Sequence, residues 1–172
     1  MSAIENVNKI ISDYFEEHLA HVDVSCGMEF GYYPDEDEIT WGLYTNERQD
    51  KTFADFFENT LGCRKIHAFI YSIFHEFGHK VTLPQFSNED WFYYRLRCDG
   101  MTDEEDADER DYMYYNLPIE EAASKWAVDY INNHYDEIVD WAAEKLCPAL
   151  DELENDPAVN EATNLLLLQG QQ

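Results

Sequence analysis

The most informative stretch of this 172-residue sequence is FIYSIFHEFGHK, residues 69–80. Apolar residues recur here, and just before it, at spacings of three and four, which predicts a helix over residues 64–80. Within it, His75, Glu76 and His79 form the pattern HExxH. Residues four apart lie on one helix face, roughly 6 Å apart along the axis, so two imidazoles can grip one ion. We therefore predict that His75 and His79 bind a metal.

Glu76 follows the first of these histidines and completes the pattern expected of a zinc hydrolase. Zinc lowers the pKa of a bound water to about 7, and a nearby carboxylate can accept its proton as the water attacks a carbonyl. Glu76 is thus the predicted general base, with one Zn²⁺ per chain. The opposing interpretation is that both histidines simply belong to a helix face, because five-residue patterns also arise by chance.

A catalytic zinc usually has three protein ligands, so a third must come from elsewhere in the chain. The extended motif HExxHxxGxxH would need a histidine where Gln85 stands, which excludes that class. A better source is LPIEEAASKWAVDYI, residues 117–131, where Glu120 and Glu121 open an alanine-rich helix that can pack closely on the metal helix. Either acid is also well placed simply to favour the helix macrodipole.

A helix that begins with glutamate, downstream of HExxH, resembles the gluzincin metallopeptidases. The ImmA/IrrE-type small intracellular peptidases are the most similar group. Their second motif, E-x-E-A-[DN]-x-F-A, is similar to residues 120–127, EEAASKWA. The resemblance implies Glu120 as the third ligand, with Glu121 as the fallback. Ser124 stands where the motif has Asp or Asn to orient a ligand histidine, and Ala122 replaces its second glutamate.

The resemblance covers mainly residues 64–131, and it implies a zinc-dependent endopeptidase that cleaves an intracellular protein. Members of the group are associated with cleavage of transcriptional repressors and often belong to phages or mobile elements. An oxyanion on the substrate would need a further donor, for which Tyr112, Tyr114 and Tyr115 are candidates just before the Glu120 helix.

The remaining pattern predicts an α+β fold in a single zincin-like domain, residues 1–172. A helix is expected at 3–19, an antiparallel hairpin of strands at 22–33 and 38–45, and further helices at 53–61, 88–96 and 117–146, with a weak point at 132–134. The HExxH helix would pack in a bundle against this sheet, with residues 38–45 as an edge strand beside the cleft. A helical extension is expected over 149–168. Gly78 marks either a close backbone or substrate approach, or a helix that ends after His79.

The charge of the chain is strongly negative, since 37 Asp and Glu oppose 11 Lys and Arg to give a formal charge of -26. Direct binding to nucleic acid or an anionic membrane is therefore disfavoured. Acids dominate residues 99–111, which predicts an exposed acidic loop. An alternative function follows, in which an acidic binding or mimic protein with a structural or vestigial zinc site engages a basic partner.

The N-terminal sequence and the cysteine pattern together predict a cytoplasmic protein. The N-terminal residues alternate charged and apolar side chains, unlike a secretory signal, and apolar stretches of the roughly 20 residues that span a bilayer are missing from the sequence. The four cysteines form no CxxC pair and are expected to be reduced thiols.

Overall fold

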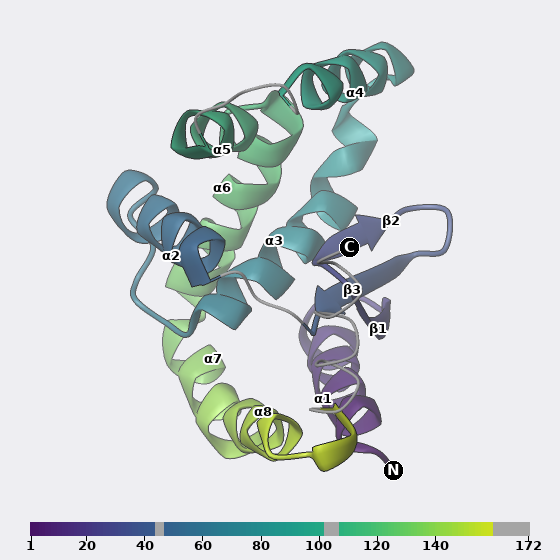
Figure 1. Cartoon of the computed structure of the whole chain (residues 1–172), viewed down its shortest axis with the longest axis vertical. Helices are drawn as coiled ribbons and strands as arrows, with labels where there is room; N and C mark the ends of the chain where they lie inside the picture. The colour runs from purple at the N-terminus through teal and green to yellow at the C-terminus, as the bar shows by residue number, and fades with distance from the viewer. Residues whose placement is uncertain (44–46, 102–106, 160–172) are drawn as a thin grey trace, which may run out of the picture. The chain divides into compact units, whose positions relative to one another are not determined.

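A computed structural model describes the backbone of residues 1–43, 47–101 and 107–159, and their side chains except at 47–50 and 107–108. The fold is α+β, as predicted, with many helices and one small sheet (Figure 1). Two compact units divide the chain: Met1–Thr45 with Asp136–Gln172, and Asn46–Tyr135. A single domain over 1–172 stays a prediction. Among the described residues, the structure contains no helix with the length and apolar character to cross a membrane.

The first unit is built on helix α1 (Ala3–His18), which forms where the apolar period predicts it. Its start is fixed by a capping box, in which the Ser2 hydroxyl accepts from the Glu5 amide and the Glu5 carboxylate accepts from the Ser2 amide. Its inner face buries Val7, Ile11 and Phe15 completely. The unit also contains most of α7 (Tyr135–Trp141), the π-helical turn η3 (Ala142–Leu146) and α8 (Cys147–Glu154).

The sheet of this unit has three strands, β1 (Asp23–Gly27), β2 (Gly31–Tyr33) and β3 (Glu38–Gly42), in the order β1-β3-β2. Strands β2 and β3 form the expected antiparallel hairpin, whose turn contains Asp37 in the left-handed conformation at φ 51°. Strand β1, however, pairs with β3 in parallel. The sheet is therefore mixed rather than purely antiparallel.

The prediction of an edge strand within 38–45 is wrong, because β3 is the central strand. Its backbone groups are paired on both sides, so it offers no free edge to a substrate. Residues 44 and 45 lie outside the described part of the chain. The sheet belongs to the first unit and the HExxH helix to the second, so the packing of one on the other stays a prediction.

The elements described in the second unit are all helical. In chain order these are α2 (Glu47–Asp55), the π-helical turn η1 (Phe56–Thr60), α3 (Ala68–Thr82), the 3-10 turn η2 (Leu83–Gln85), α4 (Asn88–Met101), α5 (Ala107–Tyr115) and α6 (Pro118–Asn133). The HExxH segment lies in α3, which starts later than predicted because His67 is its N-cap and accepts from the Phe69 amide. Helices α3 and α6 lie against each other over an extensive contact (Figure 1).

Gly78 explains how closely α3 and α6 approach. A Cβ atom at this position would lie 2.4 Å from the carbonyl oxygen of Ala123, far inside contact distance. Helix α3 continues past His79 to Thr82, whose hydroxyl donates to the Gly78 carbonyl at 2.8 Å. Of the two explanations for Gly78, close backbone approach is therefore confirmed and helix termination is wrong.

The predicted acidic loop over 99–111 is wrong wherever the structure describes it. Residues 99–101 end α4 and residues 107–111 begin α5, while 102–106 lie outside the described residues. Apolar periodicity detects a helix only when it buries a continuous stripe, and these helices bury isolated side chains such as Met101 and Asp111.

The C-terminal part of the chain follows its predicted pattern as far as it is described. The helical path breaks at His134 between α6 and α7, at the predicted weak point. Of the predicted extension over 149–168, α8 covers residues up to Glu154 and a further helical turn covers 157–159. Residues 160–168 lie outside the described residues.

Candidate metal centre

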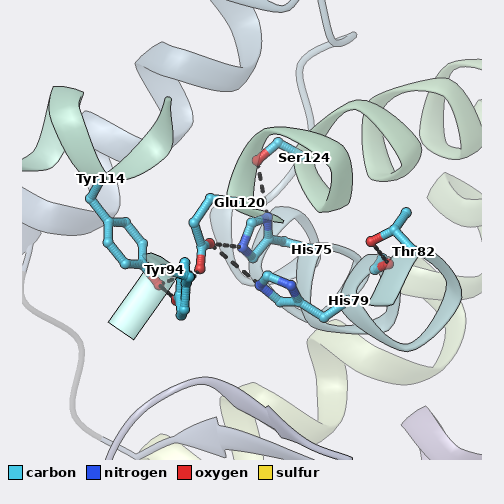
Figure 2. Close-up of polar contacts among 8 residues, drawn as sticks. His75, His79, Thr82, Tyr94, Tyr114, Glu120 and Ser124 are labelled. Carbon is cyan, nitrogen blue, oxygen red and sulfur yellow. Dashed lines mark hydrogen bonds and ion pairs between the residues drawn. The ribbon is translucent and has the colours of Figure 1, made fainter. Parts of the chain in front are cut away.

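Three buried side chains converge between α3 and α6. His75 and His79 come from consecutive turns of α3, and Glu120 comes from the first turn of α6, as Figure 2 shows. One ligand atom from each residue lies within 4.8 Å of the others, and the side chains are almost fully buried. The structure therefore brings together a group that could hold a metal ion, from residues far apart in the sequence.

The geometry of the three side chains centres on one carboxylate oxygen. Glu120 Oε2 lies 2.9 Å from His75 Nε2 and 3.4 Å from His79 Nε2. The two imidazole rings are nearly perpendicular, at 81°, with centroids 4.7 Å apart. Ligand atoms about 2.0–2.2 Å from a tetrahedral zinc would lie roughly 3.4 Å from one another. The two contacts of Glu120 are close to this spacing, so the three residues could hold one such ion.

Electrostatics make this centre attractive to a cation. Burial acts to raise the pKa of Glu120, but hydrogen bonds and positive charge from His75 and His79 outweigh it and lower that pKa. Burial acts to lower the pKa of His79, but Glu120, through a hydrogen bond and its charge, and the charge of Glu76 together raise it. The buried carboxylate of Glu120 therefore stabilises a positive charge beside it, either a proton on a histidine or a metal ion.

Ser124 lies one turn after Glu120 on α6 and contacts the first histidine. Its hydroxyl is 3.1 Å from His75 Nδ1, and both groups are buried (Figure 2). Because Nδ1 is engaged by Ser124, His75 presents Nε2 to Glu120. The residue at the motif's Asp or Asn position thus contacts the far side of a candidate ligand ring.

Two tyrosines bind the other oxygen of Glu120. Tyr114 donates to Oε1 at 2.8 Å and Tyr94 donates to it at 2.5 Å, while the two hydroxyls are 3.3 Å apart. Burial, followed by the negative charge of Glu120, raises the pKa of both phenols, so both remain protonated donors at neutral pH. Tyr114 could be predicted from the sequence but Tyr94 could not, because α4 has no apolar stripe to show which way its aromatic run faces.

The other predicted residues have different surroundings. Tyr112 is 64% exposed. The ring of Tyr115 stacks on Phe56 at 5.0 Å. Glu121, the fallback ligand, forms an ion pair with Lys125 at 2.5 Å on the outer side of α6 and does not join the buried group.

Glu76, the predicted general base, is also buried, at 8% exposure. Its charge contributes to the raised pKa of His79, which places the carboxylate in the electrostatic neighbourhood of the candidate ligands. The structure thus gathers the three residues of the HExxH pattern and Glu120 in one buried region.

A cavity of about 700 Å³ lies beside Tyr94 within the same unit. Helices α4 and α5 and the start of α6 line it, and Tyr94 belongs both to its wall and to the Glu120 contact. The lining is mainly apolar and includes Tyr93, Leu96, Met101, Met113 and Ile119. A space of this size is within the range that binds small molecules or peptide side chains.

Comparison with known proteins identifies no family for this chain. No protein-family model, curated protein or solved structure matches the chain. The class defined by the geometry is therefore a helical unit with a buried two-histidine, one-carboxylate group suited to a metal ion.

Proposed function

We propose that the protein is a zinc-dependent metallopeptidase of gluzincin type. The observation that carries the proposal is the convergence of His75, His79 and Glu120 from two helices, with Glu76 buried on the same turn of α3. Three protein ligands leave a coordination position open, as in catalytic rather than structural zinc sites. Two histidines and a glutamate are also the ligand set of known zinc peptidases.

Each residue has a distinct role in this proposal. His75, His79 and Glu120 hold the ion, and zinc when bound supplies a Lewis acid that activates water and polarises a carbonyl. Glu76 accepts the proton of the attacking water and passes it to the leaving amine. Ser124 orients His75 through Nδ1.

The substrate we propose is an intracellular protein, and the protein itself acts in the cytoplasm. The resemblance to ImmA/IrrE-type peptidases suggests a regulatory protein of a phage or mobile element. The apolar cavity beside Tyr94 supports a polypeptide substrate, because its lining suits a large apolar side chain. The formal charge of -26 favours substrates with basic residues.

The decisive experiment is the variant Glu76→Gln, which removes the base and keeps the ligands. Purified wild type loaded with zinc is incubated with a tryptic peptide library, and new termini are identified by mass spectrometry. We expect Glu76→Gln to retain one zinc per chain and to lose at least about 100-fold in cleavage rate. Glu121→Gln, an acid on the outer side of α6, is the matched control and should cleave normally. Undiminished cleavage by Glu76→Gln would contradict the mechanism.

A second candidate function is an acidic binding or mimic protein that engages a basic partner, with a metal that only stabilises the fold. The excess of 37 acids over 11 basic residues favours it. The two functions separate on metal removal, because a peptidase stops working in a chelator, whereas charge-driven binding persists and weakens with salt instead.

A further inference from the structure

The two oxygens of Glu120 have different surroundings, and this asymmetry suggests a role for two tyrosines. Oε2 faces both histidines, while Oε1 accepts from Tyr94 and Tyr114 (Figure 2). We propose that Tyr94 and Tyr114 are positioning residues that keep Glu120 a single-oxygen ligand and thereby select a small four-coordinate metal. This inference rests on the metal site of the proposed function, and does not depend on peptidase activity.

The two hydrogen bonds to Oε1 occupy this oxygen as an acceptor. Each tyrosine hydroxyl has one hydrogen, and at 2.5 Å and 2.8 Å both are directed to the same carboxylate oxygen. Glu120 is only 1% exposed, so water does not compete strongly for these bonds. Hydrogen bonds to a buried carboxylate are among the stronger ones in proteins. A metal that took both oxygens would have to break two of them.

The two donors come from separate helices, which fixes the carboxylate from independent supports. Tyr94 lies on α4 and Tyr114 on α5, whereas the ligands lie on α3 and α6. Each hydroxyl therefore reaches the carboxylate from a different helix. Two helices that carry none of the ligands thus donate hydrogen bonds to the same carboxylate oxygen.

A one-oxygen carboxylate discriminates among metals. Zinc and cobalt(II) accept four-coordinate sites of nitrogen and oxygen ligands, whereas calcium takes six to eight oxygens and readily binds carboxylates through both of them. Magnesium needs six ligands in an octahedral arrangement. With Oε1 occupied, the site offers two nitrogens and one oxygen, a set suited to zinc and poor for either alkaline-earth ion.

A simpler explanation is that the tyrosines only satisfy a buried charge. The two explanations differ in what happens to the metal when the hydroxyls are removed. If the tyrosines set the ligand mode, their loss frees Oε1 and changes the coordination of the ion. If they only satisfy charge in the apo protein, a bound metal takes over that task and its coordination stays the same.

The test uses Tyr94→Phe, Tyr114→Phe and the double variant, which keep both rings. Tyr112→Phe is the matched control, because it removes a hydroxyl from an exposed tyrosine on α5. Zinc affinity is measured by competition with a chromophoric chelator, and the visible absorption of cobalt(II) reports coordination number. We expect about 10- to 100-fold weaker zinc binding in the double variant. We also expect its cobalt spectrum to lose the intensity of a four-coordinate ion, and calcium to compete better.

Zinc affinity and a cobalt spectrum equal to those of wild type in the double variant would overturn the inference. If the double variant does not fold, by circular dichroism, the two single variants decide in the same way. Wild type that binds neither zinc nor cobalt would refute both this inference and the proposed function. Wild type that binds metal but cleaves no peptide would refute the peptidase alone and leave the role of the tyrosines to the binding data.

Discussion

Two helix pairs in the second unit differ in how they are held. The α3–α6 pair is tightly packed, with Phe74, Ala123 and Ala127 fully buried and with backbone contact at Gly78. The α4–α5 pair exposes large apolar side chains, including Phe92 at 59% and Tyr112 at 64%. Both pairs are helical, but only the first is built on a buried apolar stripe.

The exposed pair nevertheless contributes to the centre of the buried one. Tyr94 and Tyr114 extend from α4 and α5 to the Glu120 carboxylate. Packing and polar support for the ligands therefore come from separate parts of this unit. Apolar contacts hold the ligand helices together, while polar contacts connect the weakly buried helices to a ligand.

The largest expected difference between the pairs concerns two phenylalanines. Phe74 is fully buried on α3 and stacks with Tyr130 of α6 at 5.4 Å, whereas Phe92 lies on the exposed face of α4. We expect Phe74→Ala to lower the free energy of unfolding by about 3–5 kcal/mol. Phe92→Ala should change it by less than about 0.5 kcal/mol. Urea denaturation of both variants measures this, and similar losses would abolish the distinction between the pairs.

The next largest expected difference concerns two glycines, one in each helix pair. Their replacement by alanine should change the free energy of unfolding in opposite directions. Gly78→Ala places a methyl group against the Ala123 backbone, and we expect a loss of about 2 kcal/mol in unfolding free energy, with weaker metal binding. Gly100, on α4, has open space where a Cβ would lie. Gly100→Ala should therefore stabilise the helix by about 0.5–1 kcal/mol. Thermal unfolding of the two variants checks the signs, and a stabilised Gly78→Ala would contradict the close approach.

The smallest expected difference separates two neighbours on α6. Ser124→Ala removes the partner of a buried histidine nitrogen and should cost about 1–2 kcal/mol. Lys125→Ala breaks an exposed ion pair with Glu121 and should cost less than about 0.5 kcal/mol. Guanidinium titration, combined with zinc affinity, tests the pair. Equal losses of unfolding free energy in the two variants would mean that the buried polar contact in the α3–α6 interface stabilises the protein no more than the exposed ion pair.

Much of the α3–α6 pair could be predicted from the sequence. Periodicity located both helices, and the spacing of His75 and His79 placed two imidazoles on one face. The alanines of α6 and Gly78 pointed to a close contact between helices. Glu120 was distinguished from Glu121 by a motif resemblance, and in the structure only Glu120 turns toward the histidines.

Other features depend on contacts that local patterns do not encode. The alternation of residues along β3 is the same for an edge strand and a central one, so the parallel pairing with β1 was missed. The acids of residues 99–111 suggested a loop, because α4 and α5 bury single side chains rather than a stripe. The part played by Tyr94 was hidden for the same reason.

The position of Glu120 in the sequence means that a bound ion would also restrict the movement of part of the chain. Residues 80–119 run from one candidate ligand to the next, so an ion held by His79 and Glu120 closes them into a loop in the folded protein. Helices α4 and α5 lie wholly inside this loop. While the ion is bound, local opening of these exposed helices leaves both ends of the segment tethered, and reclosing costs little entropy. Metal removal would release that tether, so the segment would become the first part of the unit open to proteolysis.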